Sequence, residues 1–108
     1  MNEKYYYVLL DGGRATDMGE LNLSDLLYGF KKARLPGHEH LGYERLDGDY
    51  IIHGSDLENY YLSNRSRCFY AIMQGKAPEH TKDEIFSLKI FDSIQPIALV
   101  EWVPKNKK

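Results

Sequence analysis

The sequence lacks the features that mark secreted, membrane-spanning or disordered proteins. Its single cysteine cannot form an intrachain disulfide, so we expect a reducing, cytoplasmic location. No apolar run approaches the roughly 18–20 residues of a membrane span, and the N-terminus has no signal-peptide core. The two standard nucleotide-binding fingerprints and the nucleophile-elbow motif are also missing. These absences indicate a soluble protein with no catalytic fingerprint, and we expect no cofactor.

The charge of the chain is nearly balanced. It has 14 Lys and Arg against 16 Asp and Glu, a net charge of −2. Proteins that bind nucleic acid or anionic membranes usually present a basic surface. The balance therefore argues against both kinds of partner, and it says nothing about the oligomeric state.

The length and composition predict one small folded domain. With 108 residues, of which 43% are apolar, the chain is long enough to bury a core without disulfides. We expect a single domain over residues 1–104, followed by a basic, frayed tail at residues 105–108. The predicted fold class is α+β, with a mainly antiparallel sheet of five or six strands and one or two helices packed on one face.

Two segments are apolar enough on both sides to be inner strands. Residues 4–10 read KYYYVLL and residues 67–73 read RCFYAIM, and strands covered on both faces have this composition. Residues 14–21, between the first of these strands and a predicted helix, are expected to form a loop. That helix has Asn22 or Ser24 as its cap and ends at Pro36-Gly37.

The middle of the chain predicts a hairpin and a short helix. Residues 38–55 are expected to fold back at Asp47-Gly48, a dipeptide typical of two-residue hairpin loops. Ser55 to Glu58 form a capping-box sequence, which predicts a helix that runs to about Ser63.

Residues 83–103 are open to two interpretations. Thr81 and Glu84 would suit the start of a helix, to be followed by a strand. The alternation from Phe86 to Ile90 instead favours a hairpin that ends in a strand over residues 96–103. We favour the hairpin, because Ile85 and Phe91 would leave a helix without a polar face.

Three histidines form the most chemically suggestive group. On the hairpin predicted above, His38, His40 and His53 share one face with Glu44, and imidazoles with a carboxylate suit a bound metal ion. A small metal- or His-dependent hydrolase is therefore one alternative function. A further alternative is a nucleotide or small-ligand binder that uses the loop Gly12–Asp17, although the paired glycines also suit a tight turn with positive φ. Cys68 is expected to be buried and unreactive.

The unusual feature of the composition is its nine tyrosines. Tyrosine combines a large apolar ring with a polar tip, and it is common in half-buried positions and in interfaces. The leading hypothesis is a non-catalytic binding domain that acts as a regulator or inhibitor by docking on a protein partner. The predicted contact residues are Tyr28, Tyr60, Tyr61, Arg65 and Arg67.

Overall fold

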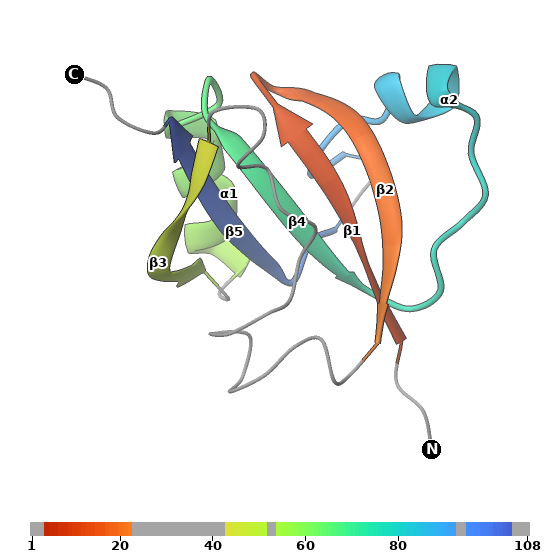
Figure 1. Cartoon of the computed structure of the whole chain (residues 1–108), viewed down its shortest axis with the longest axis horizontal. Coiled ribbons are helices and arrows are strands. Elements are labelled where there is room, and N and C mark those ends of the chain that lie inside the picture. The colour runs from red at the N-terminus through yellow and green to blue at the C-terminus, as the bar shows by residue number, and fades with distance from the viewer. Residues whose placement is uncertain (1–3, 23–42, 52–53, 93–94, 105–108) are drawn as a thin grey trace.

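A computed structural model describes residues 4–22, 43–51, 54–92 and 95–104 of the chain. Its elements follow one another from red to blue in Figure 1. They are β1 (Lys4–Asp11), β2 (Arg14–Asn22), β3 (Tyr43–Ile51), α1 (Gly54–Ser63), β4 (Cys68–Gln74), α2 (Lys82–Phe86) and β5 (Ala98–Pro104). The helix predicted to start at Asn22 or Ser24 and the tail at residues 105–108 lie outside the described residues.

The strands form one antiparallel sheet in the order β2-β1-β4-β5-β3. Its inner strands are β1, β4 and β5, and the first two match the segments that the sequence predicted to be inner strands. The first six residues of β4 are all buried, because the strand has a neighbour on each edge and packed side chains on each face. Both predictions of an inner strand are confirmed.

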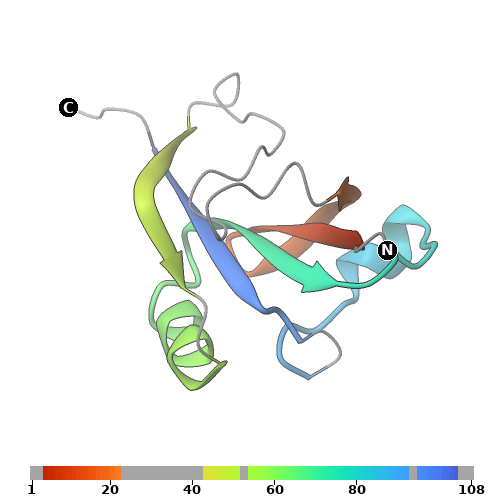
Figure 2. The same cartoon turned by 90° about the horizontal axis from the view of Figure 1, so that it is seen from below.

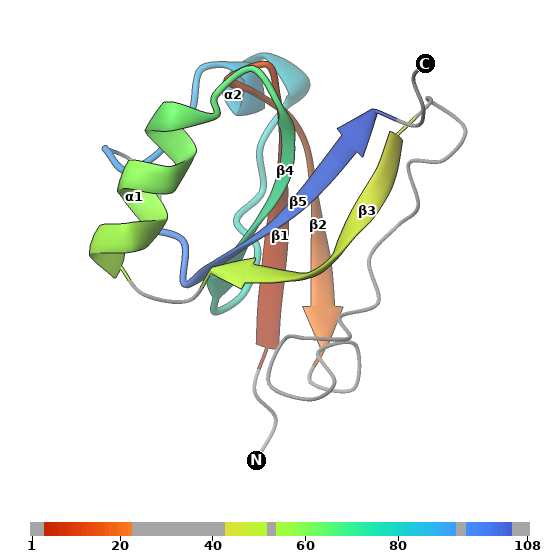
Figure 3. The same cartoon turned by 90° about the vertical axis from the view of Figure 1, so that its left-hand side faces the viewer.

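Two hydrophobic clusters cover the two faces of this sheet. On one face, α1 places Leu57 and Tyr61 against the sheet, and Ile85 of α2 joins the same cluster. Figures 2 and 3 show α1 lying against this side of the sheet. The opposite face is rich in aromatic rings: Tyr70 contacts Tyr7 and Trp102 edge to face, with centroids 5.0 and 5.6 Å apart. The α+β class and the antiparallel sheet are confirmed, and no sixth strand occurs among the described residues.

A two-residue turn joins β1 to β2. Gly12 and Gly13 have φ values of +63° and +88°, and the flanking residues Asp11 and Arg14 pair directly. Two successive positive φ values favour glycine at both positions. The interpretation of these glycines as a tight turn is confirmed, whereas the loop predicted at residues 14–21 is wrong. The turn reverses the chain, so that β2 can pair along β1. Because β2 is at the edge of the sheet, its polar residues can face solvent.

The hairpin predicted at Asp47-Gly48 is also wrong. Strand β3 continues through this dipeptide and pairs with β5, from Tyr43 opposite Pro104 to Ile51 opposite Leu99, with a shift of register between Arg45 and Tyr50. A two-stranded hairpin on its own is marginally stable. Pairing with β5 instead adds β3 to a sheet that already has a buried core.

The segment 83–103 forms a helix and a strand, so the preference for a hairpin was wrong. Thr81 Oγ1 accepts a hydrogen bond from the Glu84 amide at 3.2 Å, while Glu84 Oε1 accepts one from the Thr81 amide at 2.9 Å. This capping box starts α2, which has only five residues. So short a helix does not need a continuous polar face. The final strand, expected at residues 96–103, is present as β5, and α1 matches the predicted helix.

Gly19 of β2 makes room for an aromatic ring of β1. Tyr7 lies opposite Gly19 in the sheet, and a Cβ atom at Gly19 would come within 2.5 Å of Tyr7 Cε2. The Tyr7 ring cannot easily move away, because it is buried against Tyr70 and its hydroxyl donates to Asp17 Oδ2 at 3.4 Å. This position therefore requires glycine for reasons of space.

We expect Gly19→Ala to lower the free energy of unfolding by about 1–3 kcal/mol, the usual cost of overpacking. In a Tyr7→Leu background the clashing ring atoms are absent. There the same substitution should be neutral or stabilising, because alanine suits a strand better than glycine. Urea unfolding of the four proteins in this cycle measures the coupling. An equal cost of Gly19→Ala in both backgrounds would contradict the proposed clash.

Candidate functional site

Glu101 is the one charged side chain that is buried in the part of the chain described by the structure, with an exposed fraction of 1%. It belongs to β5 and lies opposite Phe69 of β4. A buried carboxylate is costly unless hydrogen bonds and a positive charge compensate for the lost water. The elements around Glu101 supply both.

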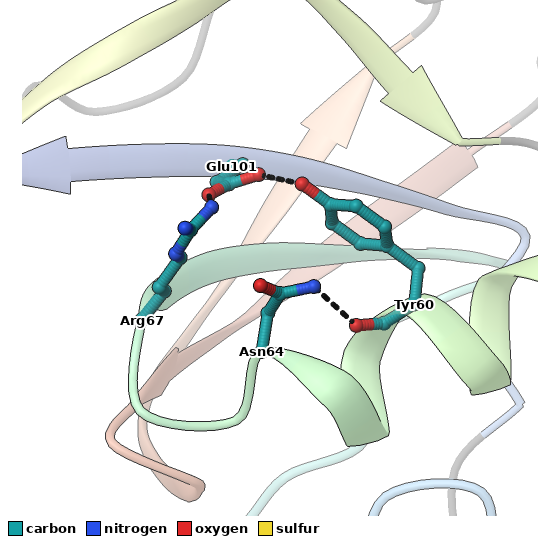
Figure 4. Close-up of polar contacts among 4 residues, drawn as sticks. All are labelled: Tyr60, Asn64, Arg67 and Glu101. Atoms are coloured by element: carbon teal, nitrogen blue, oxygen red, sulfur yellow. Dashed lines mark hydrogen bonds and ion pairs between the residues drawn. The ribbon is translucent and has the colours of Figure 1, made fainter.

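Tyr60 and Arg67 reach Glu101 from two sides (Figure 4). The Tyr60 hydroxyl donates to Glu101 Oε1, and Arg67 Nη1 lies 2.6 Å from Glu101 Oε2. The hydrogen bond and charge of Glu101 raise the pKa of Arg67. We call these three residues the Glu101 cluster, and they connect α1, the start of β4 and β5.

The connection between α1 and β4 holds this cluster in place. Asn64 Nδ2 donates to the Tyr60 carbonyl oxygen at 2.9 Å, and the Arg67 amide donates to the Asn64 carbonyl oxygen at 3.0 Å. The turn thus fixes both residues that bind the carboxylate. The Glu101 cluster therefore has a structural role, because it attaches α1 to the sheet.

The predicted contact residues therefore differ in their surroundings. Tyr61 is buried, with its ring against Phe69 and Phe91. Tyr60 is partly buried, and its hydroxyl is bound to Glu101. Arg67 keeps 46% of its side chain exposed but is bound to Glu101. Arg65 is exposed, and Tyr28 lies outside the described residues.

A cleft lies beside Arg65, where the β1–β2 turn, the end of α1 and residues 88–92 meet. Its volume is about 400 Å³. We call it the turn cleft, and it is lined by Gly13, Glu58, Tyr61, Leu62, Arg65, Leu88, Lys89, Ile90, Phe91 and Asp92. Its wall thus combines apolar side chains with both signs of charge.

Arg65 is held at the wall of this cleft. Its Nε and Nη2 atoms lie 3.7 and 3.8 Å from the point that a Cβ atom on Gly13 would occupy, so the guanidinium rests against the turn. Burial raises the pKa of Tyr61, and the charge and hydrogen bond of Arg65 partly oppose that shift. Arg65 is thus positioned before any ligand arrives.

Phe91 shapes another wall of the turn cleft. Its φ of 70° is in the left-handed region, which is unfavourable for a bulky residue. Gln95 Nε2 donates to the Phe91 carbonyl oxygen at 3.2 Å, and the ring centroid lies 5.8 Å from that of Tyr61. These contacts hold the segment in a conformation that its own backbone disfavours.

Two apolar side chains beside the β1–β2 turn face solvent. Leu62, at the cleft wall, is 51% exposed, and Phe86 of α2 is 42% exposed. Arg14, the residue that follows Gly13, places its guanidinium carbon 5.7 Å from the centroid of the Phe86 ring. Apolar surface and arginine thus occur together at this end of the molecule.

The two other sites predicted from the sequence are the histidine metal site and the loop Gly12–Asp17. His38, His40 and His53 lie outside the described residues, as does the side chain of Glu44, so the metal site stays a prediction. Among the residues that are described, no three His, Cys, Asp or Glu side chains form a group suited to a metal ion. In the loop Gly12–Asp17, the Gly12 amide donates to the Arg67 carbonyl oxygen at 3.4 Å, so this backbone donor of the predicted ligand-binding loop is already engaged within the protein.

Cys68 is fully buried, as predicted. Burial, together with the negative charge of Asp11, raises the pKa of its thiol to about 12. The nucleophilic thiolate is therefore disfavoured at neutral pH.

The sequence reasoning missed Glu101 and Leu62. A single carboxylate inside the apolar run ALVEWV is a signal that a buried partner must exist, although the sequence does not say which residue it is. Leu62 gave no signal, because it is one leucine next to the helical residues Leu57 and Tyr61.

Comparisons with protein-family models, curated proteins and solved structures found no significant match to this chain. None of the described helices has the length and apolar character needed to cross a membrane. Any inference about function therefore depends on the contacts of these residues.

We expect Arg67→Met to lower the free energy of unfolding by about 1–3 kcal/mol, because it leaves a buried carboxylate with fewer partners. In a Glu101→Met background the same substitution should cost much less, since no charge remains to be compensated. Chemical unfolding of the single and double variants measures this coupling. Additive losses would show that Arg67 and Glu101 do not stabilise the fold through one another.

Alkaline pH should destabilise the protein partly through Cys68. The pKa of its thiol is raised in the folded state from 9.0 to about 12, so its contribution is present below pH 9 and lost as pH rises from 9 to 12. The expected slope from this group is about 1.4 kcal/mol per pH unit. Cys68→Ala should show a shallower fall across this range in urea unfolding. Parallel pH profiles would contradict the assignment.

Proposed function

We propose that this chain is a non-catalytic binding domain that acts as a regulator or inhibitor by docking on a protein partner. The surface that docks is the turn cleft together with Leu62, Arg65, Arg14 and Phe86. The carrying observation is that the two exposed large hydrophobic side chains of the described part, Leu62 and Phe86, lie beside one turn.

The composition of this surface supports a protein interface. Interface centres are enriched in aromatic side chains, methionine and arginine, and a few residues supply most of the binding energy. Arg14 and Arg65 flank the turn, and each guanidinium is held close to its neighbours before binding. Side chains that are already ordered lose less entropy when a partner binds.

The proposal shifts the contact surface predicted from the sequence. Tyr61 serves the core, and Tyr60 and Arg67 compensate the charge of Glu101. These three residues are therefore assigned to the structure beneath the proposed docking surface. Arg65 remains one of its contact residues. Leu62 and Phe86 replace the tyrosines as the large apolar side chains of the proposed contact surface.

The test compares partner capture by matched variants. A tagged chain is incubated with a lysate of the cells that encode it, and bound proteins are cross-linked and identified by mass spectrometry. We expect the Leu62→Asp/Phe86→Asp variant to lose the partner captured by the wild-type chain, because each substitution would bury an unpaired carboxylate in the proposed interface. Lys76→Asp changes the net charge by the same −2 at a site past the opposite end of β4, and it should retain the partner.

Circular dichroism and thermal melting first establish that each variant is folded. A His38/His40/His53 triple alanine variant should also retain the partner, which separates this proposal from the hydrolase hypothesis. Equal capture by the Leu62/Phe86 variant would show that the partner docks elsewhere. No specific capture by the wild-type chain would contradict a protein-binding function.

A further inference from the structure

We infer that the turn cleft recognises an acidic peptide segment of the partner, in which an aspartate or glutamate lies next to a large apolar residue. This inference rests on the proposed function and names the chemistry that the surface would recognise. The carboxylate would bind Arg65, and the apolar side chain would pack against Leu62 and the floor of the cleft.

The cationic side chains at the cleft wall suit such a ligand. Within the described part of the chain, neither Arg65 nor Lys89 has a carboxylate oxygen within 4.0 Å, although both line the cleft. The guanidinium of Arg67, by contrast, is already bound to Glu101. Arginine presents five donors in a planar fork that fits a carboxylate, and a hydrogen bond to Tyr61 leaves most of them for a ligand.

Arg65 is also preorganised for this role. Its guanidinium lies beside Gly13, at ordinary van der Waals distance from the point that a Cβ atom there would occupy, and the positive φ of Gly13 disfavours other residues. A donor held in place before binding loses little entropy on forming the contact. The same turn that starts β2 therefore also sets the position of the recognition group.

The apolar part of the cleft defines the second feature of the ligand. Leu88, Ile90 and Phe91 line it together with Leu62, which is half exposed. Its volume of about 400 Å³ is within the range of sites that enclose small ligands, roughly 300–1,000 Å³. A peptide side chain or two would fill it, and burial of apolar surface would add to the affinity.

The two acidic residues of the cleft favour a single carboxylate over a polyanion. Glu58 and Asp92 line the cleft together with Arg65 and Lys89, so its cationic and anionic side chains are equal in number. A nucleic acid strand would meet repulsion from these carboxylates, and it needs an extended basic surface. A mixed peptide meets both signs of charge.

The experiment selects ligands from a random heptapeptide library displayed on phage, with the folded full-length chain immobilised. We expect enriched peptides to contain Asp or Glu beside Leu, Ile or Phe. Synthetic capped versions should bind about ten-fold more weakly to Arg65→Gln, because a charge-assisted contact is lost. Replacing the acidic residue of the peptide by its amide should have the same effect. Lys76→Gln, the matched control, should leave affinity unchanged.

Each other outcome overturns the inference. Enrichment of peptides without an acidic residue would assign a different chemistry to the cleft, and binding unaffected by Arg65→Gln would place the peptide elsewhere. Failure to enrich any sequence would show that the cleft takes no peptide. Lysate capture that survives Arg65→Gln but is lost in the Leu62/Phe86 variant would retain the proposed function while rejecting the carboxylate site. If the wild-type chain captures no specific protein from the lysate, the proposed function itself is rejected.

Discussion

The strand β4 must be shielded from water on both faces and both edges, and the other elements are arranged to do this. Its edges are bonded to β1 and β5. Tyr70 and Ile72 face the aromatic cluster, while Phe69 and Ala71 face the helices. A strand of this composition is stable only at the centre of a sheet with two covered faces. The helix α1 and the edge-to-face contacts of Tyr7, Tyr70 and Trp102 follow from that requirement.

A buried carboxylate on the helix-covered face sets a second condition. Glu101 tolerates burial because α1 and the start of β4 bring a hydroxyl and a guanidinium to it. Hydrophobic contact alone would allow α1 to pack on the sheet in several orientations. The hydrogen bonds to Glu101 are directional, so they select one of these orientations. With α1 fixed, Leu62 and Arg65 at its end lie beside the β1–β2 turn. The proposed docking surface thus depends on a polar contact in the interior.

The sequence predicted the elements whose signals are local and failed where pairing partners are distant. The apolar strands, α1 and the Gly12-Gly13 turn have short signatures, and the structure contains all of them. The dipeptide Asp47-Gly48 also has a local signature, but β5 offered β3 a better partner than a marginal hairpin. Glu101 was missed because its partners Tyr60 and Arg67 are far from it in sequence. The turn cleft combines three separate segments, which no pattern within one segment reveals.

The position of β5 between β4 and β3 has a consequence for the order in which the protein is made. Residues 98–104 leave the ribosome after every other described strand, yet they join β3 to the rest of the sheet. Until then, β3 lacks its native partner strand, and Tyr60 and Arg67 have no Glu101 to bind. The β1–β2 hairpin can form early from neighbouring residues, whereas completion of the sheet waits for long-range contacts that close slowly. The nascent chain therefore carries an unpaired apolar edge on β4 from the time β4 is made until β5 follows it.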